Sequence, residues 1–363
     1  MNGASGRFCL TIVFEERKHK RMKKILVVLT GGTIGSKAQG DIIDIRGKSP
    51  YQLLSLYEQV YHKGEEFEVI EPITTLSENM TQGLLSELCH ALDGISYEQY
   101  AGVIITHGSD TLSYTAALVG MLFHHVPVPV VLVASNLPLL SEGSNGLHNF
   151  AAGVELIREG RLRGVFVVYR NPEGITDVFL ATRLMEADPF TDSFRDFSGK
   201  PFGKMEDGRF VSIESGSTPS IEEVNRAIER NCDLPKDFGK NILLIRPYPG
   251  MSYDQFDLTT EPVAVLHYLY HSATACVEGE NTGFPQFAEK CKSLDIPVYV
   301  ASLKEQDGKR YATGEAILKA GAVPLYNISL EAAYAKLMIY YNSQLPLRKD
   351  IWENLYFESI KRQ

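Results

Sequence analysis

The stretch that decides the fold is MKKILVVLTGGTIGS, residues Met22 to Ser36, in which an apolar run leads straight into paired glycines. The run Ile25 to Leu29 lacks the period-two alternation of a half-exposed strand, which predicts an interior strand covered by helices on both faces. Gly31 and Gly32 allow a sharp turn directly after it and a close approach of the backbone to a ligand. Because parallel sheets bind ligands at the carboxyl ends of their strands, we expect a ligand-binding turn here.

This turn is compatible with other interpretations. Taken alone, TGGT also fits an ordinary glycine turn, and this alternative stays open. A dinucleotide site is a worse fit, since GxGxxG is absent and no helix pattern follows Gly35. A P-loop is excluded because Ile42 stands where that motif needs its first glycine before Gly47-Lys48-Ser49.

Apolar runs of strand length and amphipathic segments of helix length alternate along the chain. The expected strands and helices after the first strand are Leu84–Leu92, Gly102–Thr106, Leu112–Phe123, Val130–Ala134, Leu147–Ile157 and Val165–Tyr169. Such alternation is typical of βαβ units around a parallel sheet. We therefore expect an α/β fold, with a larger N-terminal domain whose mostly parallel sheet is flanked by helices and a smaller C-terminal α/β domain.

Changes in composition predict the domain boundaries. The expected segments are an extension outside the fold (1–21), the N-terminal catalytic domain (22–208), a polar linker (209–240), the C-terminal domain (241–345) and a tail (346–363). In the tail, ENLYFES resembles a viral-protease tag site, except that Glu358 stands at the position of the cleavage-point glutamine. Ile351, Leu355 and Ile360 lie near helical spacing, so we expect a native terminal helix.

Composition narrows the class of protein. The chain has 363 residues, 44% of them hydrophobic, and a net charge of -9, which argues against a nucleic-acid partner and favours a small polar substrate. Histidines and prolines interrupt the longest apolar stretch, so no membrane span is expected, and no secretory signal is visible. Five scattered cysteines form neither a disulfide framework nor a metal site. We expect reduced thiols, no metal and a cytoplasmic location.

A second motif, Thr106-His107-Gly108-Ser109-Asp110-Thr111, lies between an expected strand and an expected helix. Ser109 or Asp110 could serve simply as the N-cap of that helix, and this structural alternative stays open. The functional interpretation is that the motif binds a zwitterionic substrate at the helix N-terminus. The Asp110 carboxylate would meet an α-ammonium group, and free backbone N–H groups would meet a carboxylate.

Together, in this order and each after a strand, these motifs resemble the L-asparaginase family, from Met22 to about Tyr341. TGGTIGS is similar to the family's nucleophile motif, ITHGSDT to its second signature, and LSENMT (Leu76 to Thr81) occupies the place of its substrate loop. DIPVYVAS and ATGEAILKAGAVP resemble the second domain of the cytoplasmic, type I branch. The resemblance implies a homodimer or homotetramer that hydrolyses L-asparagine to L-aspartate and ammonia without a cofactor.

The resemblance also implies roles for individual residues. Thr33 would be the nucleophile, with Thr30 and Gly32 shaping its turn, and Ser109 would orient or activate the attacking water. Asp110 would bind the substrate's α-ammonium group. A threonine hydroxyl is a weak nucleophile, so the reaction also needs a base and oxyanion donors, and losing one such donor costs about 10²- to 10³-fold in rate.

The remaining substrate contacts would come from the LSENMT loop. There, Ser77 and Glu78 would contact the α-carboxylate and α-amino ends of the substrate. Ser109 and Gly32 belong to the substrate-binding set as well.

Three departures from the family pattern stand out. Where the family has a lysine after a threonine, this chain has Arg183, which stays charged and can orient Ser109 and stabilise charge but cannot be a general base. The spacing from Arg183 to Phe194 is extended, so the alternative that Arg183 does not occupy the lysine position stays open. The family's lid tyrosine has no clear counterpart, because Tyr51 fits better at the start of the helix expected from Tyr51 to Val60. Asn145-Gly146-Leu147 replaces the family's Asp-Gly-Pro segment.

Three functions stay open on the sequence. The favoured one is hydrolysis of L-asparagine. The second is action on another amide, such as glutamine, by an amidohydrolase or an amidotransferase component, although the acidic chain lacks room for an additional tRNA-directed domain. The third is a binding or sensor protein with weak turnover, which would still keep Thr33, Ser77 and Asp110.

Overall fold

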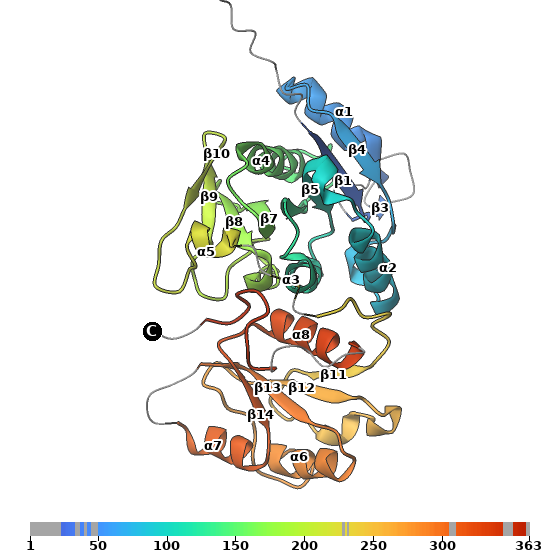
Figure 1. Ribbon diagram of the computed structural model, residues 1–363. Helices are drawn as coiled ribbons and strands as arrows, with labels where there is room; N and C mark the ends of the chain where they lie inside the picture. Colours follow the sequence, from blue (N-terminus) through green and yellow to red (C-terminus); the bar gives the residue numbers. More distant parts are fainter. Residues whose placement is uncertain are drawn as a thin grey trace, which may run out of the picture.

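The computed structural model describes residues 23–32, 37–39, 42–44, 50–226, 229–230, 232–304, 310–343 and 351–360. The chain folds into two α/β parts of different size. Helix α3 of the larger part contacts helix α8 of the smaller part between them (Figure 1). This arrangement confirms the predicted fold class. The expected extension at 1–21 lies outside the described residues.

An eight-stranded sheet forms the larger part. Its strands, in spatial order, are β10 (Arg209–Ser212), β9 (Gly203–Glu206), β8 (Thr176–Leu180), β7 (Gly164–Arg170), β6 (Pro129–Val133), β5 (Tyr100–Thr106), β1 (Lys24–Leu29) and β4 (Phe67–Ile70). The five strands from β7 to β4 in this order pair in parallel, and β8 to β10 add an antiparallel edge. The carboxyl ends of β1, β4, β5, β6 and β7 therefore meet at one edge.

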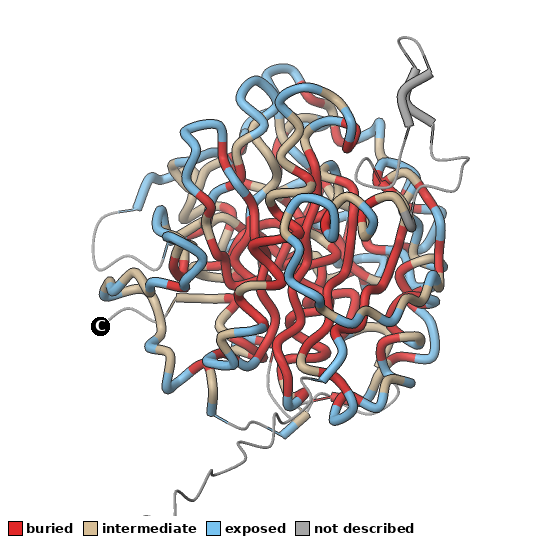
Figure 2. The backbone as a smooth tube through the Cα atoms, turned by 90° about the horizontal axis from the view of Figure 1, so that it is seen from above, coloured by how far each residue is buried: buried red, intermediate tan, exposed pale blue. Residues whose placement is uncertain are grey.

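Helices cover both faces of this sheet. Helices α1 (Pro50–Tyr61) and α4 (Gly146–Glu159) lie on one face, and α2 (Gln82–Asp93) and α3 (Leu112–Phe123) lie on the other. Along β1, Val27 packs toward α1 and α4, whereas Val28 packs toward α2 and α3. The interior strands are thus buried on both sides, which explains their uninterrupted apolar runs and the continuous buried centre in Figure 2.

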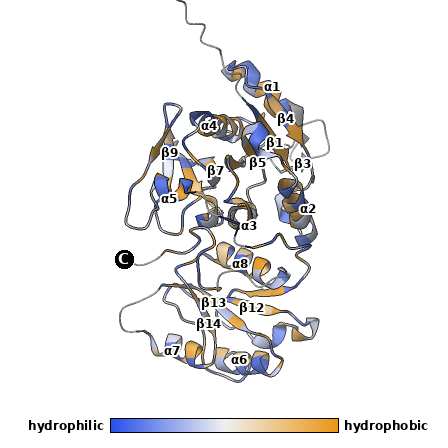
Figure 3. Cartoon of the chain, viewed as in Figure 1, coloured by the Kyte–Doolittle hydropathy of each residue, from blue (hydrophilic) through white to orange (hydrophobic). Residues whose placement is uncertain are grey.

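The smaller part is a four-stranded parallel sheet. Its strands are β11 (Ile242–Ile245), β12 (Ala264–Tyr268), β13 (Val298–Leu303) and β14 (Val323–Tyr326), and its helices are α6 (Phe284–Ser293), α7 (Ala312–Lys319) and α8 (Leu330–Asn342). Helix α8 packs against both this sheet and α3. Because α3 lies between the large sheet and α8, it is apolar nearly all round, whereas α6 and α7 mix hydrophilic and hydrophobic residues in Figure 3.

Shorter elements complete the described chain. They are the antiparallel pair β2 (Lys37–Gln39) and β3 (Ile42–Asp44), helix α5 (Ile221–Asn225), and the 3-10 turns η2 (Ser77–Asn79), η3 (Tyr97–Gln99), η4 (Ala181–Arg183), η5 (Tyr253–Gln255) and η6 (Leu258–Thr260).

The expected linker at 209–240 is wrong at its start. Residues Arg209–Ser212 form the edge strand β10, which pairs with β9 through a two-residue hairpin at Asp207-Gly208. Both turn residues have positive φ, 48° and 74°, as the tight hairpin turn requires. Val224 of α5 is buried in the core of the larger part. The first domain therefore continues past residue 208, and the Asp-Gly pair is the sequence signal that marked the hairpin.

The expected terminal helix is also wrong over the described residues 351–360, which form a compact non-helical turn. The Glu358 carboxylate accepts hydrogen bonds from the backbone N–H groups of Leu355 and Tyr356, each at 2.7 Å. Its Oε1 also pairs with Lys336 Nζ of α8 at 2.9 Å, with both side chains buried. A side chain that takes up these N–H groups competes with helix formation, so ENLYFES is a buried part of the native fold.

Candidate active site

Hydrogen bonds join the carboxyl ends of β1, β4 and β5. The Thr30 hydroxyl donates to Thr106 O at 2.7 Å, so the turn after β1 is tied to the end of β5. Gly32 N donates to Thr75 O at 2.9 Å, and Thr75 N donates to Thr30 O at 3.0 Å. The chain after β4 therefore extends the pairing of β1 beyond the sheet, and three loops converge at one point.

Two glycines make this convergence possible. Gly32 has φ +76°, and a Cβ there would lie 2.4 Å from Gly108 N. A Cβ on Gly108 would in turn lie 2.4 Å from Ser77 Oγ. Any side chain at either position would push the loops apart, which gives the glycines of TGGT and HGSD a geometric reason. The ordinary-turn alternative does not account for this contact between the motifs.

Ser77 and Asp110 meet at this convergence although they are distant in sequence. Ser77 Oγ donates to Asp110 Oδ2 at 2.8 Å, and Asp110 N lies 3.3 Å from the same Oγ. The Thr111 hydroxyl donates to Ser77 O at 2.9 Å. Ser77 is buried, whereas the Asp110 side chain is exposed to solvent. The buried Ser77 hydroxyl therefore holds the Asp110 carboxylate in place at a solvent-exposed edge of the sheet.

The other candidate residues are placed less tightly. Ser109 is half-buried in the same loop, and Glu78 is exposed in the turn η2 beside Ser77. The N-cap of α3 is Thr111, which makes no side-chain cap, so neither Ser109 nor Asp110 has the capping role. Thr33, the predicted nucleophile, directly follows Gly32 in the sequence and lies outside the described residues.

His107 is a residue of this loop to which the sequence pattern assigned no role. It is fully buried, and its backbone N–H donates to Val133 O of β6 at 2.8 Å. Its Nδ1 lies 2.8 Å from Gly108 O, which must be a hydrogen bond donated by Nδ1. Burial lowers the pKa of His107, so the ring is neutral at physiological pH. His107 thus fixes the loop that carries Ser109 and Asp110 to β6.

The structure does not bring Arg183 to this site. Strand β8 runs back beside β7 so that Leu180 pairs with Phe166, and Arg183 follows in η4 at the amino-terminal edge of the sheet. Thr182 packs against Gly120 of α3, roughly 12 Å along that helix from its first residue. The expectation that Arg183 orients Ser109 is corrected, because the β7–β8 hairpin reverses the chain before it reaches Arg183.

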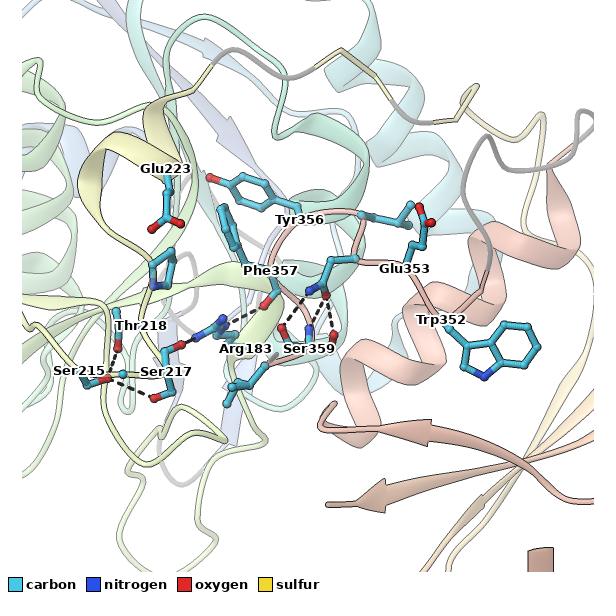
Figure 4. Close-up of a pocket in the computed structure, with 15 residues that line it drawn as sticks. Arg183, Ser215, Ser217, Thr218, Glu223, Trp352, Glu353, Tyr356, Phe357 and Ser359 are labelled. Atoms are coloured by element: carbon cyan, nitrogen blue, oxygen red, sulfur yellow. Dashed lines mark hydrogen bonds between the residues drawn. The ribbon is translucent and has the colours of Figure 1, made fainter. Parts of the chain in front are cut away.

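Arg183 has structural partners at this opposite edge. Its Nε donates to Phe357 O at 2.7 Å and its Nη1 to Ser217 O at 2.6 Å. Burial lowers the pKa of Arg183, but a guanidinium stays charged in proteins. Figure 4 shows these bonds at the wall of a pocket of about 710 Å³, between the loop of residues 215–219 and the carboxyl-terminal turn. Arg183 ties the two segments together there.

A second pocket, of about 450 Å³, lies over the ends of β6 and β7. Asn136 and Asn145 line it and exchange two hydrogen bonds of 3.0 Å between the side-chain oxygen of one and the backbone N–H of the other. Asn145 Nδ2 also donates to Arg170 O at 2.9 Å. Asn145, which stands in the altered Asn-Gly-Leu segment, therefore orders the loops beside the candidate site.

Two further observations apply to the part of the chain that the structure describes. Within it, no His, Cys, Asp and Glu side chains gather in groups of three that could hold a metal ion. In the same residues, no helix has both the length and the apolar character to cross a membrane.

The fold and the site define a two-domain α/β enzyme whose candidate site lies at the carboxyl edge of the larger sheet. Residues 24–217 match the family model described as asparaginase, N-terminal. The chain belongs to the asparaginase family and is an amidohydrolase.

Relatives extend over nearly the whole chain. L-asparaginase 1 of Escherichia coli K12 is 26% identical over 359 residues, which cover 92% of this chain and 97% of that protein. One glutamyl-tRNA(Gln) amidotransferase subunit, from Aeropyrum pernix, is 23% identical over 343 residues, or 90% of this chain and 77% of that protein. The thermostable L-asparaginase from Thermococcus kodakarensis has the same fold, with a TM-score of 0.74 and 22% sequence identity. The match covers 93% of this chain and 100% of that chain.

Proposed function

We propose that this protein hydrolyses the side-chain amide of L-asparagine to L-aspartate and ammonia, with Thr33 as the nucleophile and without a cofactor. The observation that carries the proposal is the contact between Ser77 and Asp110, whose oxygens lie 2.8 Å apart beside the glycine turn that leads into Thr33. Two of the residues expected to bind the substrate thus meet beside the turn that, in the sequence, directly precedes the residue expected to attack it.

Substrate binding follows from the charges at this edge. The carboxylates of Asp110 and Glu78 bind the α-ammonium group of asparagine. The Ser77 hydroxyl, whose single proton goes to Asp110 in the free protein, turns to donate that proton to the α-carboxylate when the substrate binds. Each of these hydrogen bonds has an ionised donor or acceptor, which makes it stronger than a hydrogen bond between neutral groups. Because Ser77 holds Asp110 in place before the substrate arrives, little side-chain entropy is lost on binding.

The chemistry is acyl transfer in two steps. The Thr33 hydroxyl oxygen attacks the amide carbon, the carbon–nitrogen bond breaks, and the nitrogen leaves as ammonia after taking up a proton. Water oriented by Ser109 then attacks the threonyl ester, releasing aspartate and returning a proton to the Thr33 oxygen. Backbone N–H groups stabilise the oxyanion of each tetrahedral intermediate, each worth about 10²- to 10³-fold in rate. Arg183 takes no part, because it lies at the other edge of the sheet.

A second candidate is hydrolysis of another amide, such as glutamine, and the similarity to glutamyl-tRNA(Gln) amidotransferase subunits favours testing it. A sensor with weak turnover would keep the same binding residues. Assembly as a homodimer or homotetramer and a cytoplasmic location stay predictions.

A coupled ammonia-release assay over L-asparagine, L-glutamine and their D-isomers tests the proposal. We expect the largest kcat/KM on L-asparagine, unchanged by a chelator. A preference for glutamine would support the second candidate. If calorimetry detected binding of asparagine but the assay detected no ammonia, the protein would be a sensor, and activity lost to the chelator would contradict the mechanism.

A further inference from the structure

A cluster of four side chains, which we call the Glu186 junction, joins α3, the end of β11 and α8 near the candidate site. Its members are Tyr114, Glu186, Arg246 and Glu331. Tyr114 lies in the first turn of α3, directly after the loop with Ser109 and Asp110. Arg246 follows β11 of the smaller domain, and Glu331 lies in the first turn of α8. Figure 1 shows α3, α8 and β11 close together where the two domains meet.

Glu186 is at the centre of this junction. Its Oε1 accepts a hydrogen bond from the Tyr114 hydroxyl at 2.7 Å, and its Oε2 accepts one from Arg246 Nη2 at 2.9 Å. Its backbone N–H donates to Glu331 Oε1 at 2.8 Å. One residue therefore connects the first turn of α3 to both a strand end and a helix of the smaller domain.

The surroundings favour this arrangement. Burial and the hydrogen bond to Glu186 raise the pKa of Tyr114, so its hydroxyl stays protonated and donates. The Arg246 guanidinium lies over the ring of Tyr268, 5.7 Å from its centroid, which holds it on the smaller domain. The ring of Tyr114 also packs edge-on against Tyr334 of α8.

We propose that Glu186 is a positioning residue for the amidohydrolase site. It fixes the first turn of α3, and with it the loop of Ser109 and Asp110, to the smaller domain through the Tyr114–Glu186–Arg246 hydrogen bonds. The smaller domain thereby sets the orientation of the carboxylate that is proposed to bind the substrate. This inference rests on the proposed assignment of Asp110 to the substrate.

The chain offers a matched control at the other end of α3. Arg230 Nη1 and Asp93 Oδ1 form an ion pair of 2.8 Å, also partly exposed, against 2.9 Å for Arg246 and Glu186. Burial, and then the charge of Arg230, lowers the pKa of His125, which follows α3. Asp93→Asn therefore removes an equivalent ion pair without touching the first turn of α3.

The experiment compares Glu186→Gln, Tyr114→Phe and Asp93→Asn in the full-length protein. We expect Glu186→Gln to raise KM for L-asparagine about three- to tenfold, with a smaller change in kcat. Tyr114→Phe should show the same effect at about half the size on a logarithmic scale, and the double variant should be no worse than Glu186→Gln. Asp93→Asn should keep wild-type kinetics.

Hydrogen exchange of the amides of residues 107–114 gives a readout that does not need turnover. It should speed up in Glu186→Gln and stay unchanged in Asp93→Asn. Wild-type KM and wild-type exchange in Glu186→Gln would overturn the inference, as would equal effects of Asp93→Asn. If Glu186→Gln did not fold, Tyr114→Phe would decide by the same measurements. A wild-type protein that released no ammonia would instead contradict the proposed function, and the exchange data would still test Glu186.

Discussion

At the carboxyl edge of the large sheet, three strand ends meet across glycines, and the carboxylate-bearing residues Asp110 and Glu78 are exposed to solvent. At the amino edge, side chains from both domains are buried against the carboxyl-terminal turn. Arg183 and Asp110 both carry charge, yet Arg183 is bonded to carbonyls of its own fold and Asp110 is open to a ligand. The carboxyl edge thus leaves charged side chains available to a ligand, whereas the amino edge uses its charged side chains to hold segments of the fold together.

The largest expected effect is at the carboxyl edge. Thr33→Ala removes the hydroxyl that we propose attacks the amide, so we expect ammonia release to fall on the order of 10⁴-fold or more. The strand before it and both glycines are unchanged, so urea unfolding should give a wild-type free energy. Wild-type-like turnover in this variant would remove Thr33 from the mechanism.

The next largest effect is expected at the amino edge, where a substitution should lower stability and leave catalysis unchanged. Glu358→Gln leaves the buried Lys336 without its carboxylate, and breaking a buried ion pair in this way costs about 3 to 5 kcal/mol in the free energy of unfolding. For protein that remains folded, kcat and KM should stay at wild-type values. A variant with full stability but impaired catalysis would break the distinction between the two edges.

Asp110→Asn should affect binding more than stability. An amide is uncharged and cannot form the proposed ion pair with the α-ammonium group of the substrate, so we expect KM for L-asparagine to rise about 10- to 100-fold. The hydrogen bond from Ser77 can persist to the amide oxygen, which should keep the melting temperature near that of the wild type. Steady-state kinetics beside thermal unfolding would check both parts, and an unchanged KM would exclude Asp110 from the site.

Arg183→Lys should give the smallest effect. A lysine cannot reproduce both bonds of the guanidinium to Phe357 O and Ser217 O, so we expect about 1 to 2 kcal/mol lower stability. Because Arg183 lies far from Asp110, kcat on L-asparagine should change less than about twofold. A clear gain or loss in kcat at unchanged stability would show that Arg183 acts on the reaction after all.

Local sequence patterns were sufficient to predict those elements whose structure depends only on their own residues. The apolar runs of β1 and β5, the helix of α3 and the glycine turns are all visible in the sequence, because strand and helix periods and glycine conformations are local properties. The short hairpin at Asp207-Gly208 could not be predicted from its strands, because each has only four residues. The prediction for the tail was wrong because Glu358, not side-chain spacing, decides its conformation.

The sequence by itself determined the α/β class, and it supplied the two candidate ligand-binding motifs and the candidate residues Thr33, Ser77 and Asp110. Only the tertiary structure decided that Ser77 meets Asp110, that Arg183 lies at the opposite edge, and that Glu186 links α3 to the smaller domain. The physical reason is that motif chemistry depends on neighbouring residues in the chain, whereas strand direction and hairpin length decide which edge a residue reaches. A reversal after Arg170 moves every later residue of β8 away from the site, and no local pattern reports that displacement.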